Sequence, residues 1–358
     1  MDDAGQLKRR IDTCLRRLVD EEEAELLRVS GELAPLCAQL RISLTRGKRL
    51  RAAFLYWGWR AAGQPDCESV VKAAAAMELV HAAACTHDDI IDDSRLRHGV
   101  PTAHAAFAEG RAGGACDTAA GAPHGERQER SAALAMLLGD LLMGYAGQVF
   151  ATCGLPGAYV ARTASLWSSL LRETVAGEFL EVLRTGGVVP KVAESLEVAR
   201  YKTAKYTVER PLHMGATLGG ASPRGLDAFT GYGMPLGEAF QLRDDLLGVF
   251  GDPAETGKSN LDDLRDKKPT ALLAVTASLL PAGPARQLHE VLGKPALDES
   301  DAALVRELME DSGARQRIED MIQERIAQAR AALDSVALPS EARSALRALA
   351  GSATDRSL

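Results

Sequence analysis

Apolar positions recur at three- and four-residue spacing over long windows of the chain, and Val and Ile rarely alternate with polar residues. This spacing is typical of amphipathic α-helices, whereas half-buried strands show a two-residue alternation. Turn signals rich in Gly and Pro separate the helical stretches, for example at residues 63–66, 154–157 and 281–284. We therefore predict an all-α protein with helices of roughly two to four turns or more and no convincing strand.

Two stretches depart from this pattern. Residues 109–130 are rich in Gly, Ala and charge and lack an apolar stripe, which predicts a flexible loop inserted between two helices. The last eight residues, 351–358, read as a disordered tail. There is no solenoid repeat and no linker strong enough to divide the chain. We therefore expect one domain over residues 1–350.

The charge and the cysteines exclude several classes of protein. A net charge of -7 argues against a general nucleic-acid binder, which needs a basic surface. The first twelve residues lack the apolar core of a signal peptide, and apolar runs such as 271–280 are too short for a transmembrane segment. The six cysteines form no CxxC pair, which favours reduced thiols over a disulfide framework or a zinc site. These features predict a cytoplasmic protein.

The segment HDDIIDD at residues 87–93 places four carboxylates at the end of a small, apolar run over residues 70–86. On a helix, Asp88 and Asp92 share one face about 6 Å apart, where unpaired carboxylates destabilise each other. A divalent cation would reverse that repulsion, and oxygen-only ligands select a hard ion such as Mg²⁺. Glu78 and His81 form an ExxH pair, which suggests a di-iron bundle as a rival, but the sequence holds no second ExxH.

A second acidic cluster follows at residues 241–252. Asp244 is again followed by an acid, Asp245, and Asp252 lies two turns further on. Gly248 stands where a third carboxylate would complete another DDxxD, so we expect this site to be weaker by one carboxylate. Two acidic helix ends that face each other could hold a cluster of Mg²⁺ ions and clamp a diphosphate.

Basic side chains accompany both clusters. Arg and Lys are the side chains that bind phosphates. Interleaved with the two acidic clusters, they predict two anion pockets, one direct and one bridged by metal. The candidates are Lys48, Arg49 and Arg51, then Arg95, Arg97 and His98, and then Lys202, Lys205, Lys258, Lys267 and Lys268.

With these motifs the sequence resembles the trans-isoprenyl diphosphate synthases, or polyprenyl synthetases. The resemblance covers most of the chain through GKRLR, ELVHAAACTHDDIIDD, LRHGVPTAH, GDLL, YKTAKYTVERPL, AFQLRDDLLGVFGD and TGKSNLDDLRDKKPTALL. It implies a single all-α domain whose helices surround a deep central cavity, the isoprenoid synthase fold, usually as a homodimer. It also implies a cluster of up to three Mg²⁺ ions, with isopentenyl diphosphate and an allylic diphosphate as the substrates.

The resemblance assigns roles residue by residue. Asp88, Asp92 and Asp244 would bind Mg²⁺, with Asp245 or Asp252 in support. Lys48, Arg51 and His81 would hold isopentenyl diphosphate, and Arg97, Lys202, Thr203, Gln241, Lys258 and Lys268 would line the allylic diphosphate. The family usually has an Arg on isopentenyl diphosphate where this chain has His98. Because His is cationic only below about pH 6.5, we expect weaker or pH-dependent binding there.

The implied reaction is head-to-tail chain elongation. Diphosphate departs, the allylic cation alkylates the double bond of isopentenyl diphosphate, and loss of a proton gives a longer allylic diphosphate. Ala83 and Ala84, five and four positions ahead of Asp88, are small where bulky aromatics would give a short product. By resemblance this favours geranylgeranyl diphosphate or a longer product.

Two other functions stay open. A class I terpene cyclase ionises the same substrates, but its Asn, Ser and Glu motif is poorly met, since Asn260 is the only asparagine and Leu264 stands at the Ser position. A noncatalytic subunit of a heteromeric synthase is the second alternative, although such subunits tend to lose the first acidic motif. A phosphohydrolase built on His87 and Asp88 fails for want of partner histidines.

Overall fold

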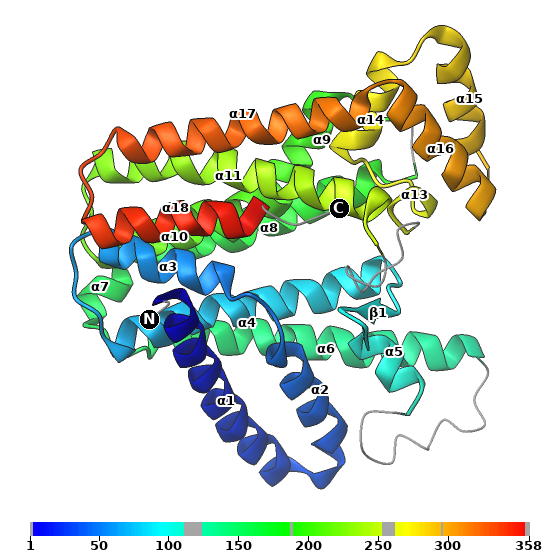
Figure 1. Cartoon of the computed structure of the whole chain (residues 1–358). Helices are drawn as coiled ribbons and strands as arrows, with labels where there is room; N and C mark the ends of the chain where they lie inside the picture. The colour runs from blue at the N-terminus through cyan, green and yellow to red at the C-terminus, as the bar shows by residue number, and fades with distance from the viewer. Residues whose placement is uncertain (1–2, 111–123, 187–188, 253–261, 295, 355–358) are drawn as a thin grey trace. The chain divides into compact units, whose positions relative to one another are not determined.

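The computed structural model describes residues 3–110, 124–186, 189–252, 262–294 and 296–354. In these ranges the elements are helices apart from one small hairpin of β1 (Leu96–Arg97) and β2 (Val100–Pro101) (Figure 1). The all-α prediction is confirmed. The hairpin was not predicted, because two residues per strand are too few to show an alternating pattern.

The chain forms two compact units, and the expectation of a single domain over residues 1–350 stays a prediction. Unit 1 comprises residues 1–56 and 65–161, and unit 2 comprises residues 57–64 and 162–358. The helices that lie in unit 1, or begin there, are α1 (Asp3–Val29), η1 (Gly31–Leu33), α2 (Ala34–Thr45), α3 (Leu50–Ala61), α4 (Glu68–Ile91), α5 (Ala103–Ala108), α6 (His124–Ala151) and α7 (Gly157–Ala161).

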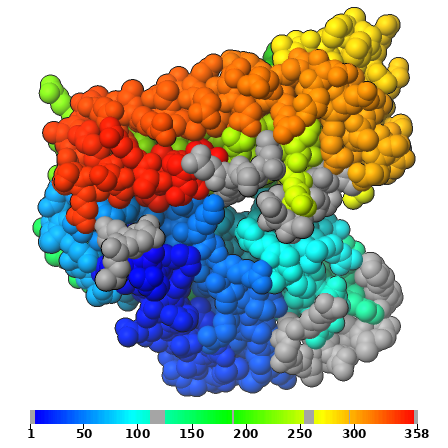
Figure 2. Space-filling model, viewed as in Figure 1, coloured from blue at the N-terminus to red at the C-terminus, as the bar shows by residue number. Residues whose placement is uncertain are grey.

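The helices of unit 2 follow in chain order. They are α8 (Ala164–Arg184), α9 (Val192–Val198), η3 (Ala199–Glu209), α10 (Arg210–Leu218), α11 (Pro223–Phe250), α13 (Asp262–Arg265), α14 (Ala271–Leu279), α15 (Ala282–Leu292), α16 (Glu299–Asp311), α17 (Ala314–Asp334) and α18 (Ser340–Thr354). In Figure 2 the side chains of α17 and α18 form the outer surface of this face of unit 2.

The core of unit 1 lies between α4 and α6, and small side chains allow the two helices to pack closely. Ala73–Ala76 are fully buried on α4, and Leu138 and Leu142 are fully buried on α6. A Cβ at Gly139 would lie 2.1 Å from Nε2 of His87, so a larger residue there would displace that ring. This packing holds the end of α4 in place, and that end carries the first acidic motif.

The core of unit 2 is built on α11, which packs against η3 and α17. Helix α11 contains Gly231, Gly233 and Gly237 and has Pro235 inside it. These residues weaken a helix by their own propensity, but glycines let a neighbouring backbone come close. Arg243 also makes a bidentate ion pair with Glu319 of α17, with Nη1–Oε1 and Nη2–Oε2 distances of 2.6 and 2.7 Å.

Two boundaries differ from the sequence prediction. Helix α6 begins at His124, so residues 124–130 of the predicted insertion are helical, as their Glu, Gln and Arg content allows. Helix α18 continues to Thr354, so residues 351–354 of the predicted tail are helical, because Ala353 and Thr354 are buried. Glu109 and Gly110 form a turn after α5, and the remaining residues of both predictions, 111–123 and 355–358, lie outside the described residues.

One helix of the described chain, over Gly125–Ala151, is long and apolar enough to cross a membrane by length and composition alone. The most apolar part of that helix is 44% buried within the protein. This is weak evidence for a membrane span, because a core helix of a globular protein passes the same test.

Candidate active site

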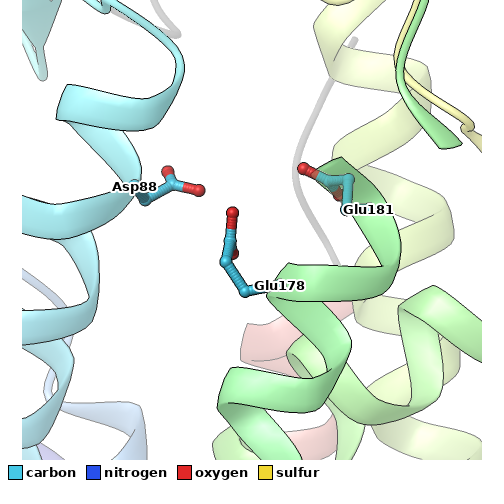
Figure 3. A group of neighbouring side chains, drawn as sticks. All are labelled: Asp88, Glu178 and Glu181. Atoms are coloured by element: carbon cyan, nitrogen blue, oxygen red, sulfur yellow. The ribbon is translucent and has the colours of Figure 1, made fainter. Parts of the chain in front are cut away.

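The first acidic motif lies at the carboxyl end of α4, as predicted. Asp88 and Asp89 are in the last turn, and Asp92 follows the helix as its C-cap, where its N–H donates to the Asp88 carbonyl at 2.9 Å. Asp89 is buried, whereas the Asp88 carboxylate is partly exposed and projects from the end of α4 (Figure 3). Asp93 is exposed and has a left-handed backbone, with φ +47°.

Arg97 on β1 binds this motif directly. Its Nη2 lies 2.8 Å from Oδ2 of Asp88 and 2.7 Å from Oδ1 of Asp89, and its Nε donates to Asp89 at 2.9 Å. The sequence predicted Arg97 as a ligand of the allylic diphosphate, and did not predict that the same side chain neutralises the acidic motif. A positive charge shared by two carboxylates removes the repulsion that the motif would otherwise carry.

Positive charges act on His81, which lies about two helical turns before Asp88 on α4. Its pKa is well below the ordinary value, first because the ring is buried and then because of the positive charges of Arg51, Arg97 and His98. A neutral imidazole has one donor and one acceptor nitrogen. The arrangement therefore provides a hydrogen-bonding ring within a positive environment, which suits an anion.

Arg49 has a different role from its neighbours in GKRLR. It is buried and left-handed with φ +58°, and its Nε donates to Asp12 at 2.8 Å. Its Nη1 lies 3.6 Å from the buried carboxylate of Glu78, which also accepts from the Ala52 N–H at 3.0 Å. Glu78 thus holds the start of α3, which disfavours the di-iron alternative. Lys48 is exposed and Arg51 is partly buried in the same segment.

His98 occupies the turn of the β1–β2 hairpin. It is exposed, with φ +52°, and Gly99 follows with φ +72°. Its carbonyl accepts a hydrogen bond from Nη1 of Arg46 at 2.5 Å. The backbone of the residue that departs from the family pattern is therefore fixed, while its side chain is accessible.

In unit 2, Lys202 and Thr203 lie on η3, which is a π-helix. π-helical turns are rare and often occur at functional sites. Two glycines on neighbouring helices make room for this wide helix. A Cβ at Gly177 of α8 would lie 2.2 Å from the Lys202 nitrogen, and one at Gly237 of α11 would lie 2.3 Å from the Ala204 Cα.

Two carboxylates on α8 bind Lys202. Its Nζ lies 2.9 Å from Glu178 and 2.6 Å from Glu181, and Nζ of Lys268 is 3.9 Å from Glu181. The two glutamates are one turn apart on the same side of α8 (Figure 3). Neither glutamate was predicted from the sequence, although two acids at i and i+3 next to a glycine in an apolar helix were a usable signal.

A chain of hydrogen bonds connects η3 to the second acidic motif. The Thr203 hydroxyl donates to Gln241 Oε1 at 2.5 Å, and Gln241 Nε2 donates to Asp245 Oδ1 at 2.8 Å. The Ala271 N–H, the first of α14, donates to Asp245 Oδ2 at 2.9 Å. Burial raises the pKa of Asp245 to about 7 despite these donors.

These contacts separate the two aspartates of the second motif. Both oxygens of the buried Asp245 already accept hydrogen bonds, which leaves fewer lone pairs on this carboxylate for a metal. Asp244 is more accessible and is the better ligand of the pair. Asp252 is exposed just after α11 ends. Lys258 lies outside the described residues.

The missing carboxylate at Gly248 is supplied by another segment. Oδ2 of Asp263 on α13 lies 2.1 Å from where a Cβ of residue 248 would be. Asp263 therefore occupies the space that a third acid of the motif would need. The expectation of a site weaker by one carboxylate counted only residues along α11. The pair Asp262-Asp263 after Gly257-Lys258 is the signal in the sequence for this additional carboxylate.

The donor atoms of both motifs fit a magnesium site. Asp88, Asp92 and Asp244 offer carboxylate oxygens, the ligands that Mg²⁺ prefers. Burial raises the pKa of Cys85, the cysteine nearest to the first motif along α4, which keeps its thiol protonated and a poor ligand.

Comparisons with known proteins identify relatives of this chain. The family model for polyprenyl synthetase matches residues 35–311. A (2E,6E)-farnesyl diphosphate synthase of Mycobacterium tuberculosis is 31% identical over 274 residues, which cover 75% of this chain and 68% of the relative. A geranylfarnesyl diphosphate synthase of Aeropyrum pernix is 30% identical over 281 residues, which cover 77% of this chain and 80% of the relative.

A solved structure extends the likeness to nearly the whole chain. Geranylgeranyl pyrophosphate synthase from Corynebacterium glutamicum, complexed with isoprenyl diphosphate and magnesium, matches with a TM-score of 0.90 at 34% identity. The match covers 99% of this chain and 100% of that one. The resemblance noted from the motifs is confirmed, and the chain belongs to the polyprenyl synthetase family, as an all-α prenyltransferase.

Proposed function

We propose that this enzyme condenses isopentenyl diphosphate with an allylic diphosphate, head to tail, to give a trans-polyprenyl diphosphate and free diphosphate. The observation that carries the proposal is that each acidic motif stands beside anion-binding groups within its own unit. Arg97 binds Asp88 and Asp89, and Thr203 is linked to Asp245 through Gln241. Carboxylates for metal next to cations for phosphate are what a diphosphate-ionising enzyme needs.

Mg²⁺ is the metal that the donor set fits. Asp88, Asp92 and Asp244 would hold it, in a cluster of up to three ions, with Asp245 in support. When bound, the metal supplies positive charge that stabilises the departing diphosphate.

The chain's own residues then have distinct tasks. Lys48, Arg51 and His81, with His98 at the edge, would bind and orient isopentenyl diphosphate. Arg97, Lys202, Thr203, Gln241, Lys258 and Lys268 would bind the allylic diphosphate. Since Arg97 and Lys202 now pair with carboxylates, each would exchange part of that pairing for a phosphate oxygen. The released diphosphate would accept the proton that the product loses.

Geranylgeranyl diphosphate is the product that we propose. Ala83 is fully buried and small, and Ala84 is small and partly buried, so neither side chain blocks the path ahead of Asp88. The relatives are named for farnesyl, geranylfarnesyl and geranylgeranyl products, so family membership leaves the length to such residues.

The test is an assay with Mg²⁺, isopentenyl diphosphate and each allylic primer in turn, followed by sizing of the dephosphorylated alcohols. Asp88→Asn should lower kcat/KM by about 10²–10³. Asp93→Asn, in the same motif but exposed, is the matched control and should change it little. A hydrocarbon made from geranylgeranyl diphosphate alone would support the cyclase instead, and no product from any primer would support a noncatalytic subunit.

A second copy of this chain is the partner that we propose. Val175, Phe179 and Leu183 form a stripe on α8 with 65%, 64% and 66% exposure, and the first two line an open hollow of about 600 Å³. Monomers rarely expose such a contiguous apolar patch, and a self-complementary stripe suits a two-fold dimer. Light scattering should give twice the chain mass for the native protein and a smaller mass for Phe179→Glu. A native monomer would contradict the dimer.

The cytoplasm is the location that we propose. The described cysteines, Cys14, Cys37, Cys67, Cys85 and Cys153, are all free thiols, as a reducing compartment would keep them.

A further inference from the structure

A cavity of about 650 Å³ lies within unit 1, away from the acidic motif. One face of α1, the first turns of α4 and Cys153 after α6 line it, and we call it the α1 pocket. The first half of α1 lies across the beginning of α4 (Figure 1), where Arg10 binds Asp66 and Glu68 at 2.9 and 2.7 Å. Its volume is within the usual range for sites that bind small molecules.

The lining of the α1 pocket is basic in a chain whose net charge is -7. It holds Arg9, Arg10, Arg17 and Lys72 against two acids, Glu21 and Glu68. Glu68 is already neutralised by Arg10. Within the described part of the chain, Arg9, Arg17 and Lys72 form no salt bridge or hydrogen bond. Three cations and one acid, Glu21, therefore remain around the hollow, and this excess of positive charge attracts an anion.

Lys72 is close to the inner wall of the α1 pocket. Burial raises the pKa of the Cys14 and Cys153 thiols. The positive charge of Lys72 acts on both thiols and lowers their pKa, which only partly offsets the burial. One ammonium group therefore lies near both thiols. Since these thiols stay protonated at neutral pH, they add no negative charge and are poor metal ligands.

Hydrogen-bond donors complete the lining. Thr13 and Ser69 bring hydroxyls, and Ser69 is in the first turn of α4. The N-cap of α4, Cys67, makes no side-chain hydrogen bond to the helix, so the positive end of a 24-residue helix adds to the cations.

We propose that the α1 pocket is a second anion site that binds a diphosphate group. Three cations with hydroxyl donors suit a multiply charged phosphate better than a single carboxylate, and the cations exclude a metal ion. The group can come from free diphosphate or from the charged end of a prenyl diphosphate, whose chain would lie against Leu18 and the two thiols. The inference stands on this pocket alone and does not depend on the proposed reaction.

The test uses Cys14 as a reporter inside the pocket. The full-length protein is alkylated with iodoacetamide in EDTA, with or without inorganic diphosphate, and labelling at each cysteine is followed by mass spectrometry. Diphosphate should slow labelling of Cys14 at least about threefold. In Lys72→Gln this protection should disappear, and in Arg28→Gln, an exposed cation further along α1, it should persist.

Separate arms with geranyl diphosphate and inorganic phosphate identify the source. Protection by inorganic diphosphate assigns the site to the free ion, and protection by geranyl diphosphate alone assigns it to a prenyl ester. Cys14 labelling that no anion slows would overturn the proposal, as would equal protection in Lys72→Gln. Cysteine labelling does not involve turnover, so the result does not depend on whether the protein has prenyltransferase activity.

Discussion

Gly237 tests whether the π-helix η3 depends on close approach by α11. A Cβ at residue 237 would lie 2.3 Å from the Cα, 2.6 Å from the Cβ and 2.9 Å from the carbonyl oxygen of Ala204. Ordinary contact begins near 3.4 Å, so Gly237→Ala would push the two backbones apart by about 1 Å. Backbone atoms cannot rotate away as the end of a flexible side chain can.

The expected cost follows from two opposing terms. Overpacking of a close contact costs about 1–3 kcal/mol, and Ala regains up to about 1 kcal/mol of helix propensity over Gly. We therefore expect Gly237→Ala to lower the free energy of unfolding by about 1–2 kcal/mol. Since Ala204 follows Thr203, we also expect the hydrogen bond between Thr203 and Gln241 to weaken and kcat to fall.

Two other glycines provide matched controls. At Gly231, on the same helix, the nearest atom to a new Cβ is the Ala332 methyl at 3.2 Å, so the change should be nearly neutral. Gly144 is exposed in the middle of α6, with no described atom within 4 Å, and Ala there should raise stability by about 0.5–1 kcal/mol. Urea unfolding followed by circular dichroism ranks the three variants by their free energy of unfolding. A Gly237→Ala protein as stable as Gly231→Ala would refute the close approach.

Three further predictions concern the site and the core. His98→Arg should lower the KM for isopentenyl diphosphate and make it less dependent on pH between about 6 and 9, and two identical flat profiles would contradict this. Ala83→Phe should shift products toward farnesyl diphosphate, so an unaltered chromatogram would argue against Ala83 as the floor. Burial lowers the pKa of His213, so the unfolded chain takes up a proton first and stability falls as the pH drops below about 6.5. The slope from this group is at most about 1.4 kcal/mol per pH unit, and urea midpoints of His213→Gln should change less between about pH 6.5 and 5.

The position of the first motif could be predicted because it depends on one helix. The small apolar run before Asp88 predicts a buried helix that ends at the acids. In the structure, α4 is buried over this run and ends at Ile91. The function of each charge could not be predicted in this way. Arg49 and Arg51 are two residues apart in one basic segment, yet Arg49 faces inward to Asp12 and Glu78. Contacts with distant parts of the chain decide which of the two arginines stabilises the fold, and these contacts cannot be read from the segment itself.

For the second acidic motif, even less of the role of each residue could be predicted from the sequence. Asp244 and Asp245 look equivalent in sequence, but Asp245 is buried and bridges Gln241 and the start of α14. Gly177 and Gly237 from two other helices make room for the π-helix η3, and this close approach cannot be seen in the residues of η3 themselves. Asp263 takes the space beside Gly248 although it is fifteen positions away in sequence.

The composition of α11 has a consequence for the order of folding. In the middle of this helix, Gly231, Gly233 and Gly237 together with Pro235 cost about 5–6 kcal/mol of intrinsic helix propensity relative to alanine, so α11 has little tendency to form alone. Its structure therefore has to form together with η3 and α17, whose side chains and backbones fill its glycine gaps. In pulsed hydrogen exchange during refolding, amides of α11 should gain protection late and in the same kinetic step as those of η3. The helix that carries the second acidic motif would then be among the last parts of unit 2 to become ordered.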